Sequence, residues 1–310
     1  MSKRERAMVP PATPRSYYGQ PVIHPPIWSW EIGAYLFVGG LAGASGLVAG
    51  GARLAGNVPL AQRASALALA GAVVSPVLLI SDLGRPERFL RMLRVFKPTS
   101  PMSVGTWILS TLGPSAGVAA GWQLVGFPPK GWGVPAQVAT SITGPLLSTY
   151  TGALLAQTAV PVWHDARREL PYLFTASSLA SAGGALAAIT PPAAAGPART
   201  LAVGGAIAEL GIGELMERRL DPRIRASYEA PTVQAFHRAA RALTAAGAVT
   251  IAAAGARSRS AAIGGGLALC AGAALTRWAL FKAGSASAAD PEQTVGPQRE
   301  RRDAHEAAAA

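Results

Sequence analysis

Charged residues are scarce in this chain of 310 residues, since Asp, Glu, Lys and Arg make up only 14% of it. Ordinary soluble domains carry about 25% charged residues, so much of this chain is expected to avoid water. The single cysteine, Cys270, excludes an intramolecular disulfide, a cysteine-ligated iron–sulfur cluster and a cysteine-rich zinc site within the chain. Aromatic residues make up 6%, too few for the stacking platform of a single-strand nucleic-acid binder.

The shortage of charge leaves long apolar runs, which are typical of membrane-spanning helices. Such a helix needs roughly 17–25 mostly apolar residues. A soluble, alanine-rich helical protein is the alternative, but so many apolar stretches would leave too little polar surface. We therefore predict an all-α integral membrane protein with eight transmembrane helices, near residues 30–52, 60–81, 103–123, 137–160, 172–190, 200–217, 238–256 and 260–281.

The net charge of +12 falls mainly on one side of the predicted membrane. With eight spans both termini lie on the same side, and most Lys and Arg residues lie in the tails and loops of that side. Because basic loops stay in the cytoplasm, we expect a multi-pass protein of the cell (inner) membrane with both termini cytoplasmic. The charge then requires no nucleic acid, and it also attracts anionic lipid or an acidic partner. Residues 1–27 are predicted to form a cytoplasmic tail and residues 284–310 a disordered one.

The loop after the second predicted span, residues 81–103, carries the densest pattern. Pro86 suits the first turn of a helix, and Pro98 would end it. Apolar side chains fall on one face of that helix and Arg side chains on the other, which predicts a short amphipathic helix on the cytoplasmic surface. Lipid headgroups alone could hold such a helix, but Asp82 and Glu87 among so many Arg favour an ion-pair network that shapes the loop for a partner. The candidate docking residues are Arg85, Arg88, Arg91, Arg94 and Lys97.

Four sequence runs resemble the NrfD family of polysulfide-reductase membrane subunits: DLGRP at 82–86, KPTSPMSVGTW at 97–107, WSWEIGAYLF at 28–37 and YTGALL at 150–155. The resemblance implies two four-helix bundles, here residues 28–165 and 166–283, with a quinone site in the first. It also implies a chain that is not catalytic alone. The partners that it implies are a four-cluster, ferredoxin-like iron–sulfur subunit and a molybdopterin-type catalytic subunit.

A quinone site needs an apolar slot, hydrogen-bond donors for the carbonyl oxygens and a group that exchanges protons. Glu31 and Tyr35 are four residues apart, so they share a helix face at the start of the first span. Tyr150 lies within the fourth span, and Asp82 ends the second span on the same side as Glu31. We expect these four residues to converge. Glu31 could instead be an interfacial acid, the tyrosines packing residues, and Asp82 a structural partner of a nearby Arg.

Further acidic residues and one histidine are candidates for a proton relay. Glu209 is placed in mid-membrane, where it either relays protons or is a buried protonated carboxyl bonded to a neighbouring helix. Glu214 is five residues on and does not share its face. His164, at the end of the fourth span, is either a proton-entry group or a surface histidine.

A haem group between helices needs two suitably placed axial ligands, and none of the four histidines falls in the middle of a span. We therefore expect no haem and no iron–sulfur cluster in this chain, with menaquinone or ubiquinone as its redox molecule. A transporter or a passive membrane anchor is the alternative function. The long match at residues 82–107 favours the quinone-binding subunit.

Overall fold

A computed structural model of the protein describes residues 23, 28–83, 85–296 and 306, and the regular structure in these ranges is helical throughout. Eight helices of 20 residues or more lie within them. They are α1 (Trp30–Leu54), α2 (Val58–Asp82), α4 (Pro101–Val125), α5 (Lys130–Ala156), α7 (Leu170–Ile189), α8 (Gly196–Arg219), α10 (Pro231–Ala254) and α11 (Arg259–Ala289).

Local sequence signals explain where several of these helices begin and end. The Ser100 side chain accepts a hydrogen bond from the backbone N–H of Ser103, and Pro101 occupies the first position of α4. The same helix ends at Gly126, whose φ of 74° lies in the left-handed region that favours glycine. At the start of α2, the Asn57 side chain accepts from the Leu60 N–H. Each cap satisfies a backbone group that the helix itself leaves without a partner.

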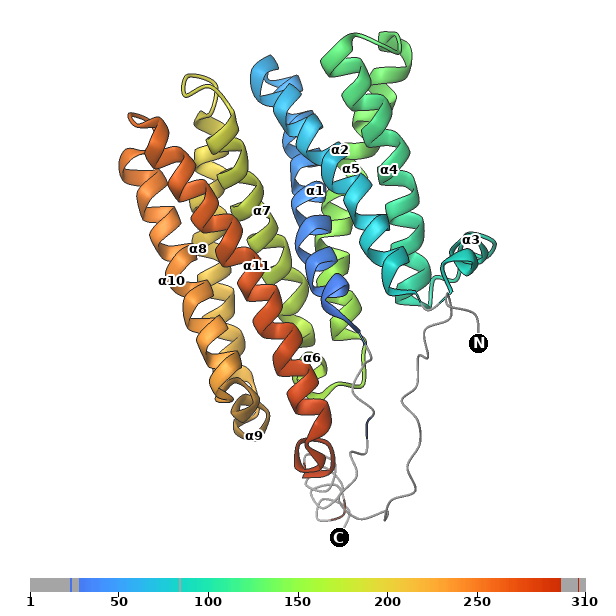
Figure 1. The fold of residues 1–310 in the computed structure, drawn as a ribbon, viewed down its shortest axis with the longest axis vertical. Coiled ribbons are helices and arrows are strands. Elements are labelled where there is room, and N and C mark those ends of the chain that lie inside the picture. The colour runs from blue at the N-terminus through green and yellow to red at the C-terminus, as the bar shows by residue number, and fades with distance from the viewer. Residues whose placement is uncertain (1–22, 24–27, 84, 297–305, 307–310) are drawn as a thin grey trace.

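The long helices lie side by side and are connected by short segments (Figure 1). Helices α1, α2, α4 and α5 pack on one another, as do α7, α8, α10 and α11. Helix α7 also packs along α1 and α5, so the two sets share an interface. The short helices α3 (Phe89–Met92), α6 (Pro161–Asp165) and α9 (Pro222–Arg225) all lie at the end of the molecule where α1 begins, and this end is called the α9 end below.

Small residues allow the helix backbones to approach closely. A Cβ atom on Gly43 of α1 would lie 2.2 Å from the carbonyl oxygen of Gly144 in α5. A Cβ on Gly205 of α8 would lie 2.5 Å from the backbone nitrogen of Ala180 in α7. Contacts of this kind are typical of helix association inside membranes.

Four of the long helices are long and apolar enough to cross a membrane: α1, α2, α7 and α11. The other four are α4, α5, α8 and α10, which occupy predicted spans and lie beside the apolar ones. The all-helical fold is confirmed, whereas the number of crossings and the division into two bundles stay predictions.

Two boundaries from the sequence analysis are wrong. Helix α11 continues to Ala289, because Gly284 packs under the Trp163 ring and Ser287 and Ala288 are buried, so the C-terminal tail does not begin at residue 284. The predicted amphipathic helix does not reach Pro98. It consists of a 3₁₀ turn at Pro86–Arg88 followed by α3, which ends at Met92.

Hydrogen bonds to α4 explain the early end of α3. The Ser103 hydroxyl donates to the carbonyl oxygen of Val95 at 3.3 Å and accepts from the N–H of Lys97 at 3.0 Å. These contacts hold the chain of residues 95–97 against the first turn of α4. The predicted N-terminal tail, residues 1–27, lies outside the described residues except for Ile23.

Candidate functional site

A carboxylate pair lies at the α9 end, where α1 begins and α2 ends. The Ser29 hydroxyl contacts both Oε2 of Glu31 and Oδ1 of Asp82, and the Ser29 N–H donates to the same Asp82 oxygen at 3.3 Å. The structure thus brings together two acids that are 51 residues apart in the chain. Asp82, the last residue of α2, thus accepts a hydrogen bond at the N-terminus of α1, where backbone N–H groups lack partners within the helix.

Stacked aromatic rings hold the segment that carries Ser29. The Trp28 ring stacks on Trp163 with ring centroids 5.6 Å apart, and Trp163 stacks in turn on Phe281 at 6.4 Å. The Trp163 indole N–H donates to the carbonyl oxygen of Leu280 at 2.8 Å. The start of α1 is therefore fixed against α6 and α11, which fixes the position of Glu31.

The two predicted tyrosines lie on helices that pack together, Tyr35 on α1 and Tyr150 on α5. Tyr35 is 2% exposed, and the two phenols interact electrostatically. Two glycines make room for the rings. A Cβ on Gly105 of α4 would lie 2.0 Å from Tyr150, and one on Gly39 would lie 3.3 Å from Tyr35. The absence of side chains at Gly39 and Gly105 therefore leaves the space that the two phenol rings occupy between the helices.

Further groups around the tyrosines combine polar and apolar character. The Ser75 hydroxyl of α2 is buried, has no hydrogen-bond partner among the described residues, and borders the same space beside Gly39 as Tyr35 does. Leu109, Leu112 and Leu147 form a buried apolar cluster against which Tyr150 packs. The site thus offers hydroxyl donors next to an apolar surface, as small-molecule sites commonly do.

A second buried polar site joins α1, α7, α8 and α11 around Arg277. The Arg277 side chain is fully buried and donates five hydrogen bonds, which are to the carbonyl oxygens of Leu36, Phe174 and Ala273 and to the hydroxyls of Ser177 and Ser178. A guanidinium has five N–H donors, so every donor has a partner.

Glu209 belongs to the same buried site. Its Oε1 atom accepts from Ser177 and from Thr276, each at 2.8 Å, and Ser177 in turn accepts from Arg277. The carboxyl group is bonded to neighbouring helices, as one of the two predicted alternatives requires. Its other oxygen, Oε2, is buried without a partner among the described residues.

The remaining relay candidates lie nearer the surface. The His164 side chain is exposed. Glu214 forms ion pairs with Arg218 and Arg241, each at 2.9 Å. Arg241 also pairs with Glu217 at 2.9 Å, and Glu217 lies 3.1 Å from His237. Glu214 therefore lies among ion pairs near the surface, whereas Glu209 lies in the buried site around Arg277, as their spacing along α8 predicted.

Tyr228 lies beside this cluster of ion pairs at the α9 end. Its side chain is 7% exposed, and its hydroxyl has no hydrogen-bond partner among the described residues. Burial, together with the nearby Glu217 carboxylate, raises the pKa of Tyr228 above its ordinary value. The phenol therefore keeps its proton and is available as a hydrogen-bond donor.

The candidate docking residues lie before, on and after the short helix α3. Arg85, Arg91, Arg94 and Lys97 are exposed, and Arg88 lies in the 3₁₀ turn. Leu90 is 70% exposed and Phe96 is 57% exposed, so this segment also presents apolar side chains.

Sequence reasoning missed Ser29, Ser75, Gly105 and Arg277. Ser29 and Gly105 lie within sequence runs that resemble the family, so the resemblance could have indicated that both matter for the site. Arg277 stands at the edge of an apolar run, where an arginine is usually taken for a topology charge.

Long apolar helices that bury hydrogen-bonded polar groups indicate an integral membrane protein. The family model "Polysulphide reductase, NrfD" matches residues 20–216, and the chain belongs to the NrfD family. This family comprises membrane subunits of redox complexes, and the chain is assigned to that class. No curated protein matches the chain significantly.

Proposed function

We propose that this chain binds quinone or quinol and exchanges its electrons with a docked iron–sulfur subunit, with coupled proton transfer. Three features of the first four helices carry the proposal: Tyr150 packs against an apolar cluster, Tyr35 lies on the neighbouring helix α1, and the carboxylate pair lies one helical turn before Tyr35. When bound, a quinone supplies two-electron, two-proton redox chemistry. Menaquinone and ubiquinone have the same reacting ring positions, and either would suit this donor set.

The tyrosine and serine hydroxyls are the binding groups in this proposal. Tyr35 and Tyr150 donate hydrogen bonds to carbonyl oxygens, and Ser75 offers a buried hydroxyl without another partner. Leu109, Leu112 and Leu147 exclude water from one side. A buried donor left unpaired is unfavourable, so a ligand oxygen at this position is stabilising.

The carboxylate pair is the proton-exchanging group in this proposal. The Ser29 hydroxyl has one proton and contacts two carboxyl oxygens, so it donates to only one of them at a time. In this proposal the pair passes protons between the quinone and water at the edge of the membrane.

The proposed complex contains a four-cluster iron–sulfur subunit and a molybdopterin-type catalytic subunit. The exposed basic and apolar residues of 85–97 suit the docking of an acidic partner. In this arrangement all eight long helices cross the cell (inner) membrane, both termini lie in the cytoplasm, and the α9 end faces the cytoplasm.

Quinone content and visible absorption of the gently purified protein test the proposal. We expect quinone in the organic extract and no haem bands in the spectrum. The Tyr150→Phe variant keeps the ring but removes the donor, so it should carry less quinone after the same purification. A wild-type protein without quinone, even when purified with added lipid and quinone, would favour a passive anchor or a transporter instead.

A further inference from the structure

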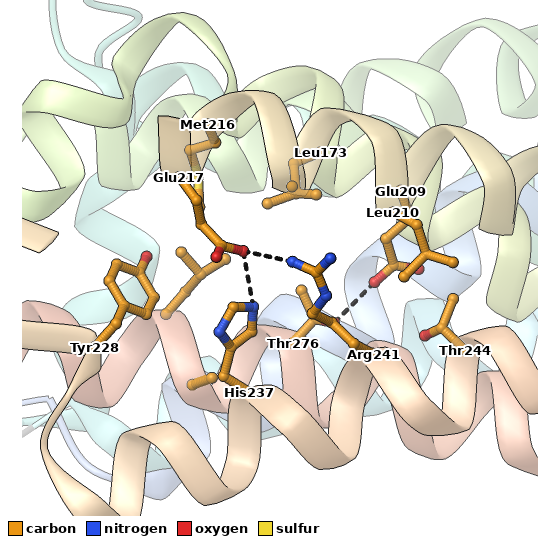
Figure 2. Close-up of a pocket in the computed structure, with 13 residues that line it drawn as sticks. Leu173, Glu209, Leu210, Met216, Glu217, Tyr228, His237, Arg241, Thr244 and Thr276 are labelled. Atoms are coloured by element: carbon orange, nitrogen blue, oxygen red, sulfur yellow. Dashed lines mark hydrogen bonds and ion pairs between the residues drawn. The ribbon is translucent and has the colours of Figure 1, made fainter. Parts of the chain in front are cut away.

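A cavity lies within α7, α8, α10 and α11, away from Tyr35 and Tyr150. Its volume is about 40 Å³, and it is lined by residues of α7, α8, α10 and α11 together with Tyr228 (Figure 2). Glu209 and Thr244 lie toward one end of it and Tyr228 toward the other, with Glu217, His237 and Arg241 between them.

Three of the lining residues have buried oxygen atoms without a hydrogen-bond partner among the described residues. These atoms are Oε2 of Glu209, Oγ1 of Thr244 and the hydroxyl oxygen of Tyr228. The side chains are 4%, 1% and 7% exposed, respectively. Buried polar groups in folded proteins are nearly always bonded to protein or to ordered water. Three such atoms around one cavity therefore indicate a ligand that is polar and small.

The size and charge of the cavity identify the ligand as water. A water molecule needs about 10–15 Å³ of such space, so 40 Å³ admits about two or three molecules. A lipid chain or a quinone ring is too large. A metal cation is disfavoured because Arg277 interacts with Glu209 from one side and Arg241 and His237 line the cavity on the other.

We propose that the cavity holds ordered water that connects the buried Glu209 carboxyl group with the Glu217–His237–Arg241 cluster near the α9 end. Water would supply the missing partners of Glu209, Thr244 and Tyr228. Along α8, Glu209 lies ten residues before the end of the helix at Arg219, a distance of roughly 15 Å at the usual rise per residue. The water thus gives a deeply buried carboxyl group a hydrogen-bonded route for protons toward the α9 end. This inference does not depend on quinone binding in the first four helices.

Hydroxyl-radical footprinting of the intact protein in lipid nanodiscs tests the proposal, because X-ray pulses generate radicals from bound water inside proteins. We expect oxidation of Tyr228, Met216 and Leu173, all of which line the cavity although each is at most 7% exposed. Trp163 is more reactive by chemistry but is fully buried elsewhere, and it should stay unmodified. Oxidation at Tyr228 alone would confine the water to the outer end and overturn the connection to Glu209.

A matched pair of glycine variants tests whether the labelling comes from the cavity. Gly213 lines the cavity, and a Cβ there meets only Leu173 at 3.9 Å, so the valine of Gly213→Val occupies the space that the water needs. Gly211 lies two residues away, is exposed and has nothing within 4 Å of its Cβ position. Gly213→Val should lose the labelling of Met216 and Leu173, whereas Gly211→Val should keep it. Equal labelling in both variants, or a wild-type protein labelled no more than Trp163, contradicts the proposal.

Discussion

Replacing Arg277 with methionine should destabilise the protein more than any surface substitution. Methionine approximates the length of the arginine side chain but removes the charge and the five donated hydrogen bonds. The acceptors lie on α1, α7 and α11, so the change loosens the interface between the two sets of helices. It also leaves the Glu209 carboxyl group without the nearby positive charge.

The expected magnitude follows from the burial of both groups. Each buried hydrogen-bonding group that loses its partner typically costs about 1–3 kcal/mol, and Arg277→Met removes the partner of buried groups on three helices. Arg218 provides the control, since its side chain is 74% exposed and pairs with Glu214 one turn earlier in the helix. Exposed pairs of this kind contribute about 0.2–1 kcal/mol, so Arg218→Met should have a small effect.

Reversible unfolding in mixed micelles, titrated with SDS and followed by tryptophan fluorescence, gives the free energy of unfolding. The double variant Glu209→Gln/Arg277→Met should recover part of the loss, because the uncompensated carboxylate is gone. If Arg277→Met unfolds at the same SDS concentration as Arg218→Met, the reasoning on the buried pair is refuted.

Further predictions concern the quinone site, the topology and the docking surface. Gly105→Ala should displace the Tyr150 ring and lower quinone affinity in a binding titration, whereas Gly113→Ala, with nothing within 4 Å, should not. Tyr150→Phe should weaken binding by about 1–3 kcal/mol, the cost of leaving a buried partner unpaired. Reporter fusions should place Pro98 and the C-terminus in the cytoplasm and Lys130 outside, and a periplasmic reading at Pro98 would exclude a cytoplasmic partner. Changing Arg88, Arg91 and Arg94 to Glu should release the iron–sulfur partner in a pull-down at moderate salt. Retention of the partner would indicate that these residues anchor the loop to lipid instead.

The positions of the long helices could be read from the sequence because apolar runs and cap residues are local signals. Asn57, Ser100 and Gly126 mark helix boundaries by chemistry that acts within a few residues. The approach of Glu31 to Asp82 could also be expected, since both stand at the same end of neighbouring helices.

Other features depend on parts of the chain far apart in sequence and could not be read in this way. Arg277 is buried because Ser177 and Ser178 lie about one hundred residues earlier and present their hydroxyls to it. Even over a shorter separation, the end of α3 is set by the Ser103 hydroxyl in the first turn of α4 rather than by Pro98. Helix α11 extends past the predicted boundary because Gly284 fits under Trp163, a contact that no helical periodicity encodes.

The most direct test of the central claim is quinone-linked turnover of the purified complex with the Glu31→Gln variant. Glutamine keeps the shape and the hydrogen-bonding reach of the side chain but cannot release the proton. Turnover with quinone should fall by roughly 10²–10⁴, the usual contribution of general acid–base catalysis. Activity with an artificial dye, which bypasses the membrane subunit, should survive, and the exposed Glu229→Gln variant should be unaffected in both assays. Full quinone turnover in Glu31→Gln would contradict the assignment of proton exchange to this carboxylate pair.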